Sequence, residues 1–251
     1  MIFFVILQLA LVVLAHELGH YFFARLAGVR VISFNIGFGL KLLSFKRGET
    51  IYALRCIPIG GYVQIADDQT VPQVPLSERY ENKSWLARFG VVSGGTLGNF
   101  LFAWLIFYIL PIWYKKTFIT VAAGLYKSFL VLLQLLMDML QGIISLFTQA
   151  GLEGLSGPIG IINTSFASTQ NGAAFFLLFT AFLSVNLGML NLLPFPGLDG
   201  GRLVFLLYEL VFRRKPNPAV ERWVHGIGLF ILFWLLILVS WRDLLNLKQM
   251  I

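Results

Sequence analysis

The sequence predicts an α-helical, polytopic membrane protein with about four transmembrane helices, a β-hairpin region and amphipathic helices on the outer surface. Of its 251 residues, 58% are hydrophobic and only 12% are charged, whereas about 25% of the residues in a soluble domain are charged. A transmembrane helix needs about 20 predominantly apolar residues, and four stretches of the chain meet this requirement. These numbers exclude an ordinary water-soluble globule, a disordered chain and a fibrous repeat.

The four expected spans are about residues 1–24, 91–114, 173–194 and 223–241. The first starts without the basic region and the small-residue cleavage site of a signal peptide, so we expect it to be retained. The second contains no charged residue. The fourth has Trp223 and Trp241 at its ends, where interfacial aromatic residues are expected.

The basic residues predict the orientation of these spans. Of the 19 Lys and Arg residues, 14 lie between spans one and two or between spans three and four, and five lie elsewhere. By the positive-inside rule, the two basic loops face the cytoplasm and both termini lie on the outer side. This distribution also explains the net charge of +7, so we expect no nucleic-acid partner. The single cysteine, Cys56, cannot form an internal disulfide.

Two segments differ from the four spans. Residues 119–150 are apolar but carry Asp138 and other polar residues, and a crossing here would turn the basic cluster at 213–215 to the outside. We therefore expect one or two amphipathic helices lying on the outer surface. Residues 31–65 mix β-branched and aromatic residues with glycines such as the Gly60–Gly61 pair, which predicts strands joined by tight turns.

An H-E-x-x-H motif lies inside the first span, at His16-Glu17-Leu18-Gly19-His20. On a helix, residues four apart share one face, so both imidazoles can reach one zinc ion while Glu17 stands beside them as a candidate general base. Ionisable groups at membrane depth cost about 2.5–3.5 kcal/mol each and usually mark a functional site. A polar cluster that is hydrogen-bonded between helices is the alternative, but metal ligation satisfies the imidazoles better.

Asp199 is the best candidate for a third metal ligand, because a catalytic zinc takes three protein ligands and a water. It is the only charged residue from 154 to 201, and it follows two prolines that break the third span near its inner end. The other candidates are His225, the only remaining histidine, and Glu49 in the expected strands. An interfacial helix cap is the alternative role for Asp199.

Several motifs occur in a fixed order along the chain: His16-Glu17-Leu18-Gly19-His20, Ile36-Gly37-Phe38-Gly39, Ile57-Pro58-Ile59-Gly60-Gly61-Tyr62-Val63, Asn82-Lys83-Ser84, residues 155–161, and residues 184–201. Together they resemble the site-2 protease family of intramembrane zinc metalloproteases, and within it the bacterial RseP type. The resemblance extends over most of the chain. It implies that His16, His20 and Asp199 bind Zn²⁺ and that Glu17 activates the water that hydrolyses the peptide bond.

The resemblance also implies how a substrate binds. Asn186 and Asn191 would help to bind the substrate or the reacting carbonyl, although hydrogen bonding between helices is the alternative role for both. Gly60 and Gly61 would lie in a membrane-associated β-hairpin whose edge strand pairs with the unwound substrate. The substrates would be single-span proteins of the bacterial cytoplasmic membrane, such as anti-sigma factors or remnant signal peptides.

Two departures from the RseP type stand out. That type carries PDZ domains between the second and third spans, but here residues 111–118 lead almost directly into the amphipathic segment. We therefore expect no PDZ domain and a single protease domain over residues 1–251, and we infer no obligate oligomer. The family's Gly-Pro before the asparagine of span two is replaced by Gly95-Thr96-Leu97-Gly98-Asn99.

Three rival functions are weaker. A di-iron hydroxylase or desaturase needs about eight histidines, an expectation from resemblance, and this chain has three. A transporter or metal permease would use His16, Glu17, His20 and Asp199 as an ion pathway, but the chain has no inverted repeat. A catalytically inactive membrane chaperone on the same scaffold would not need the intact Glu17.

Overall fold

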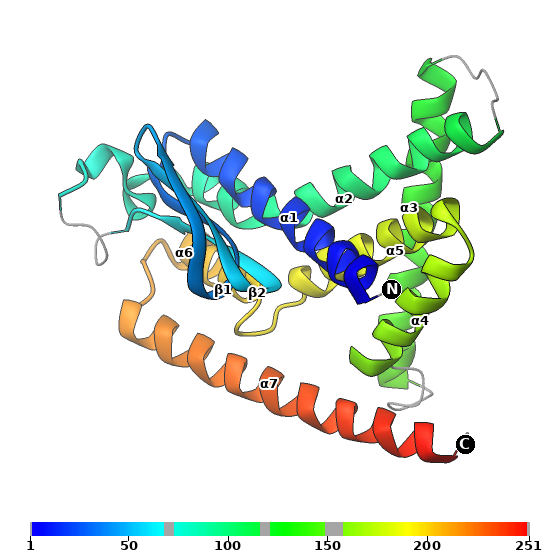
Figure 1. Cartoon of the computed structure of the whole chain (residues 1–251). Helices are drawn as coiled ribbons and strands as arrows, with labels where there is room; N and C mark the ends of the chain where they lie inside the picture. Colours follow the sequence, from blue (N-terminus) through cyan, green and yellow to red (C-terminus); the bar gives the residue numbers. More distant parts are fainter. Residues whose placement is uncertain (1, 68–72, 116–120, 149–157, 250–251) are drawn as a thin grey trace.

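The computed structural model describes residues 2–67, 73–115, 121–148 and 158–249 (Figure 1). Within these ranges the chain is mostly helical and has one small sheet. The elements, in chain order, are α1 (Ile2–Leu26), β1 (Val31–Arg47), β2 (Thr50–Ile65), two short 3-10 helices (Leu76–Glu78 and Tyr80–Asn82), α2 (Trp85–Lys115), α3 (Val121–Thr148), α4 (Pro158–Gln170), α5 (Ala173–Leu192), α6 (Asp199–Phe212) and α7 (Pro218–Gln249).

In the described ranges, five helices are long and apolar enough to cross a membrane, as a polytopic membrane protein requires. Four of them, α1, α2, α5 and α7, overlap the four expected spans, although α5 ends two residues before the expected end of span three. The fifth is α3, a single continuous helix inside the expected amphipathic segment. Residues 119, 120, 149 and 150 of that segment, and residues 155–157 of one family motif, lie outside the described ranges. Helix α4 was not among the expected elements.

Helices α1 and α2 pack with their backbones in contact. Five of the six buried residues of α1 recur every three or four positions and so form one stripe that faces the protein: Val5, Gln8, Val12, His16 and Gly19. This stripe meets glycines of α2. A Cβ atom on Gly94 would lie 2.9 Å from the Gly19 carbonyl oxygen, and a Cβ atom on Gly98 would collide with the carbonyl oxygen of Ala15. Small residues permit this close approach of two membrane helices.

Contacts between the helices give their relative directions. The pairs Gly19–Gly94 and Ala15–Gly98 show that α1 and α2 are antiparallel. Near the start of α1, the Gln8 amide donates to the Phe176 carbonyl (3.1 Å) and to the Thr180 hydroxyl (2.9 Å), both near the start of α5. Helices α1 and α5 therefore start side by side. Asp199 follows α5 and, as described below, meets the second half of α1, so these two helices run in the same direction.

The strands expected in residues 31–65 are present and form an irregular two-stranded sheet. The register places Ser33 opposite both Gln64 and Ile51, and Ile36 opposite both Gly61 and Leu54. Residues 33–36 therefore lie between the two halves of β2. One side of residues 61–65 pairs with β1, and β2 packs along α1 (Figure 1). The free side of this segment consequently faces the helix that carries the H-E-x-x-H motif.

Helices α3, α4 and α6 pack against α2, α5 or both. Buried apolar side chains of α2, α3 and α5 form one core: Ala103, Ile106, Leu132, Ala181 and Val185. The predicted break after span three is confirmed, because α5 ends at Leu192 and α6 begins at Asp199. Helix α7 lies along the lower side of the molecule in Figure 1 and is largely exposed. It contacts α4 and the loop that precedes α6.

Candidate metal centre

The two histidines of the H-E-x-x-H motif point toward each other from successive turns of α1. Their ring centroids are 4.7 Å apart, and their Nε2 atoms are separated by 3.1 Å. His16 is buried and belongs to the stripe of α1 that faces α2. The helical spacing predicted this pairing, because residues four apart share one face of a helix.

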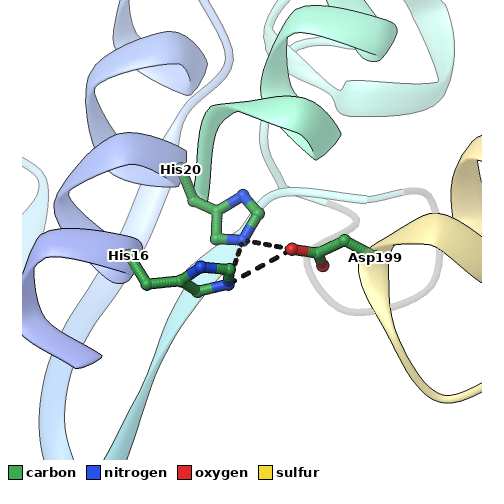
Figure 2. Close-up of side chains that lie close together, drawn as sticks. All are labelled: His16, His20 and Asp199. Atoms are coloured by element: carbon green, nitrogen blue, oxygen red, sulfur yellow. Dashed lines mark hydrogen bonds and ion pairs between the residues drawn. The ribbon is translucent and has the colours of Figure 1, made fainter. Parts of the chain in front are cut away.

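Asp199 completes a triangle of ligand atoms with the two histidines. Its Oδ2 atom lies 3.2 Å from His16 Nε2 and 3.1 Å from His20 Nε2. Figure 2 shows both rings pointing at this carboxylate, which comes from the first turn of α6. The broken helix between α5 and α6 thus delivers the carboxylate to α1. The structure brings together the three residues expected to bind metal.

The triangle fits a zinc ion. Zinc binds nitrogen and oxygen ligands at about 2.0–2.1 Å with tetrahedral geometry, which places neighbouring ligand atoms about 3.3 Å apart. The observed separations are 3.1–3.2 Å. Asp199 Oδ2 is buried and has no hydrogen-bond partner in the part of the chain that the structure describes. Two imidazole nitrogens and one carboxylate oxygen that converge in this way are a ligand set that suits a zinc ion.

The His20 ring is held in the tautomer that can bind metal through Nε2. Its Nδ1 atom lies 2.8 Å from the backbone carbonyl oxygen of Val91 on α2. Because a carbonyl oxygen only accepts, Nδ1 carries a proton, and in the neutral ring Nε2 then keeps a free lone pair. Such a contact between the second ring nitrogen and a backbone carbonyl fixes the tautomer and orientation of metal-binding histidines in general.

Asn99 of α2 serves His16 in a comparable way. The Asn99 amide nitrogen Nδ2 lies 3.3 Å from His16 Nδ1. The Ser184 hydroxyl lies 3.3 Å from the amide oxygen Oδ1 of Asn99 and donates to its backbone carbonyl oxygen at 2.9 Å. The oxygen and nitrogen of an asparagine amide are assigned from its hydrogen bonds and can be exchanged by a half-turn that leaves the side chain in the same place. After this exchange, the Asn99 amide oxygen accepts from His16 Nδ1–H and its NH₂ group donates to the Ser184 oxygen. Every polar group of this buried cluster is then paired, and His16 Nε2 is free for metal.

Gly95 of α2 leaves the space in which the two imidazoles meet. A Cβ atom at this position would lie 2.5 Å from Cε1 and 2.7 Å from Nε2 of His16, and it would collide with Nε2 of His20. The glycine therefore forms one wall of the site, where any side chain would displace the ligand atoms. Asn99 and Gly95 belong to a motif that the sequence analysis noted only as a departure from the family pattern. The signal that could have identified them is a run of glycines and one asparagine inside an apolar span.

Glu17 lies beside the triangle, on the side of α1 that faces β2. A Cβ atom on Gly61 would lie 3.2 Å from Glu17 Cγ, and the backbone N–H of Val63 donates a hydrogen bond to the Glu17 carboxylate. The free edge of residues 61–65 is therefore in direct contact with the expected general base. Gly60 has a φ of +97°, and its Cα lies against the Phe38 ring, so a larger residue would be strained there.

The two asparagines expected to bind substrate are not part of the triangle. Both are half-buried, Asn191 lies in the last turn of α5, and the Asn186 amide donates to the Phe182 carbonyl of the same helix at 2.9 Å. The rejected ligand candidates also lie elsewhere. Glu49 pairs with Arg30 at 2.9 Å, and His225 accepts a hydrogen bond from Gly197 rather than joining the two other histidines.

These features define a zinc metalloprotease whose candidate ligands lie on and between apolar helices of membrane length. The chain belongs to peptidase family M50, the family of the site-2 proteases, because the family model matches residues 4–235. The resemblance noted in the sequence is thereby confirmed.

Curated relatives have matching names. A protein of Helicobacter pylori strain J99 named "Putative zinc metalloprotease" is 27% identical, with 91% of this chain and 95% of the relative covered. A zinc metalloprotease named RasP, from Oceanobacillus iheyensis, is 45% identical over 96 residues, which are 38% of this chain and 23% of the relative. The alignment with the Helicobacter protein extends over 338 positions, so that relative contains segments that this 251-residue chain lacks.

Proposed function

We propose that this protein is an intramembrane protease that hydrolyses peptide bonds within the transmembrane segment of single-span membrane proteins. In this proposal, His16, His20 and Asp199 hold the zinc ion and Glu17 is the general base. The observation that carries it is the convergence of three ligand atoms, 3.1–3.2 Å apart, on the apolar helix α1 and the broken segment after α5. A zinc site in this position meets the peptide bonds of a substrate at membrane depth.

In the proposed reaction, the zinc ion, Glu17 and the residues that hold the two histidines have separate roles. Zinc, when bound, supplies a Lewis acid that polarises the scissile carbonyl and makes a water molecule acidic near neutral pH. Glu17 takes a proton from the attacking water, whose oxygen bonds to the carbonyl carbon, and delivers that proton to the leaving nitrogen as the C–N bond breaks. Val91 and Asn99 keep the two imidazoles in the required tautomers.

The free edge of β2 is the proposed docking place for the substrate. A transmembrane helix hides its peptide groups in internal hydrogen bonds, so a scissile segment must first unwind. An unwound segment can then pair with residues 61–65 as an added strand. The contact of Gly61 and Val63 with Glu17 supports this assignment, because it places the edge strand directly beside the general base. Asn186 and Asn191 on α5 are proposed to bind the substrate from the opposite side.

We further propose four spans, with α3 on the outer surface and both termini outside the bacterial cytoplasmic membrane. Helices α1 and α5 run in the same direction, which requires an odd number of crossings by the helices that follow α1 and precede α5. If α3 crossed after α2, then α4 would have to cross as well. The 13 residues of α4 span only about 20 Å, less than the hydrocarbon core of about 30 Å.

Mapping of cleavage products by mass spectrometry tests this function. A single-span test substrate is incubated in detergent with the zinc-loaded protein and with the Glu17→Gln variant, which keeps the size of the side chain but cannot accept a proton in the same way. We expect cuts inside the apolar segment with the wild type and none with the variant. Cleavage by both proteins would contradict the role of Glu17, and cuts confined to the polar flanks of the substrate would contradict intramembrane proteolysis.

A further inference from the structure

The third histidine of the chain lies on α7 and contacts the loop that leads to Asp199. The backbone N–H of Gly197 donates a hydrogen bond to His225 Nδ1 at 2.9 Å. Because Nδ1 accepts this bond, the ring is neutral and its proton is on Nε2. The Phe205 ring of α6 lies 5.5 Å from the imidazole, centroid to centroid. His225 thus contacts both the loop before α6 and α6 itself.

The backbone of this loop is pressed against one face of α7. A Cβ atom on Gly228 would collide with the Pro196 carbonyl group. Gly197 has a φ of +97°, and a Cβ atom there would lie 3.0 Å from the backbone nitrogen of Leu229. Residues 225, 228 and 229 share one face of the helix, as positions i, i+3 and i+4 do. The closeness of this contact depends on glycine in both partners.

The loop needs an external hydrogen-bond partner. Pro194 and Pro196 have no N–H group and cannot continue the helix. Within residues 193–198, two backbone hydrogen bonds are formed. The Phe195 N–H donates to the Leu193 carbonyl, and the Leu198 N–H donates to the Phe195 carbonyl. The Gly197 N–H is satisfied by His225. Only one residue, Leu198, separates this anchor from the carboxylate that must be placed to within a few tenths of an ångström.

We propose that His225 is a positioning residue for Asp199: its neutral imidazole ties the loop, and with it the carboxylate, to α7. This inference rests on the proposed role of Asp199 as a metal ligand. His225 itself does not bind the metal, since Nδ1 is engaged by Gly197 and the ring is outside the ligand triangle. A displacement of α7 relative to the core would therefore weaken metal binding.

The test compares two substitutions in the full chain, purified in detergent. His225→Asn places an amide oxygen close to the position of Nδ1 and can still accept from the Gly197 N–H, whereas His225→Leu fills similar space and cannot. Zinc affinity is measured by competition with a chromogenic chelator, and the ligand geometry is read from the visible absorption spectrum of the Co²⁺-loaded protein. We expect His225→Leu to lose about 10–100-fold in zinc affinity and to show an altered Co²⁺ spectrum. His225→Asn should restore most of both.

Two controls separate the possible failures. Gly226→Ala lies on the same helix, and its Cβ atom meets nothing within 4 Å, so it should bind zinc as the wild type does. Asp199→Asn tests the proposed site itself, because unchanged zinc affinity in this variant would contradict the ligand assignment. If Asp199→Asn loses zinc but His225→Leu retains wild-type affinity and spectrum, the positioning role is wrong. Equal losses in His225→Leu and His225→Asn would also overturn it, since the hydrogen bond would then not be the cause.

Discussion

Substitution of Gly95 by alanine should remove metal binding while leaving the helices intact. Ordinary van der Waals contact of a Cβ atom begins at about 3.4 Å, but the new atom would lie 2.5 Å from Cε1 and 2.7 Å from Nε2 of His16. The His16 ring would have to move by about 0.7–0.9 Å, and His20 would have to move as well. Zinc sites tolerate errors of about 0.2 Å in ligand distance. We therefore expect zinc affinity to fall by at least about 100-fold.

The imidazoles cannot retreat without losing other contacts. His20 is hydrogen-bonded to the Val91 carbonyl, and His16 is hydrogen-bonded to Asn99. Both of these partners belong to α2. An outward shift of α2 would relieve the collision but would break the same two hydrogen bonds. Overpacking of this kind costs typically about 1–3 kcal/mol, so the protein should fold with a lower melting temperature.

The assay combines chelator competition for zinc affinity with circular dichroism for helix content. Gly142→Ala is the matched control, because its Cβ atom would meet nothing within 4 Å, and it should behave as the wild type in both measurements. The reasoning would be refuted if Gly95→Ala bound zinc with wild-type affinity and cleaved a test substrate at the wild-type rate. It would also be refuted if the control lost as much zinc affinity as Gly95→Ala did.

Four further predictions follow from other contacts. Asn99→Leu should lower zinc affinity by about 10–100-fold, whereas Asn99→Asp, which keeps an acceptor for His16 Nδ1–H, should lose less in the same chelator assay. Val63→Pro removes the N–H that faces Glu17 and obstructs the free edge, so kcat/KM should fall while zinc affinity is unchanged. Removal of zinc should lower the melting temperature of the wild type, since a ligand present at 1,000 times its Kd stabilises by about 4 kcal/mol, but should scarcely affect Asp199→Asn. Arg88 hydrogen-bonds both carboxylate oxygens of Glu209 (2.6 and 2.8 Å) and lowers the pKa of that group. A lowered pKa contributes stability above the unfolded value of about 4.5, so thermal melts should show this contribution being lost as the pH falls below that value, and Glu209→Gln should lack it.

Much of the architecture could be predicted because it depends on local sequence. Four apolar runs predicted four of the long helices, and the glycine-punctuated β-branched segment predicted the strands. The fifth apolar helix, α3, shows where local reasoning is insufficient. Its composition allows a crossing, and the argument against one depends on α1 and α5 starting side by side, as the contacts of Gln8 show. That is a property of packing.

The amino-acid sequence alone was enough to identify the candidate ligands. The spacing of His16 and His20 places both on one helix face whatever surrounds them, and an isolated charge after two prolines singled out Asp199. Only the tertiary structure decided what makes these residues a site, because each supporting contact joins residues far apart in the chain. Val91 and Asn99 orient the imidazoles from α2, Gly95 leaves the space between them, and His225 anchors the loop from α7. A backbone carbonyl or a missing side chain carries no signature in sequence, and its effect exists only when packing brings it within hydrogen-bond or contact distance.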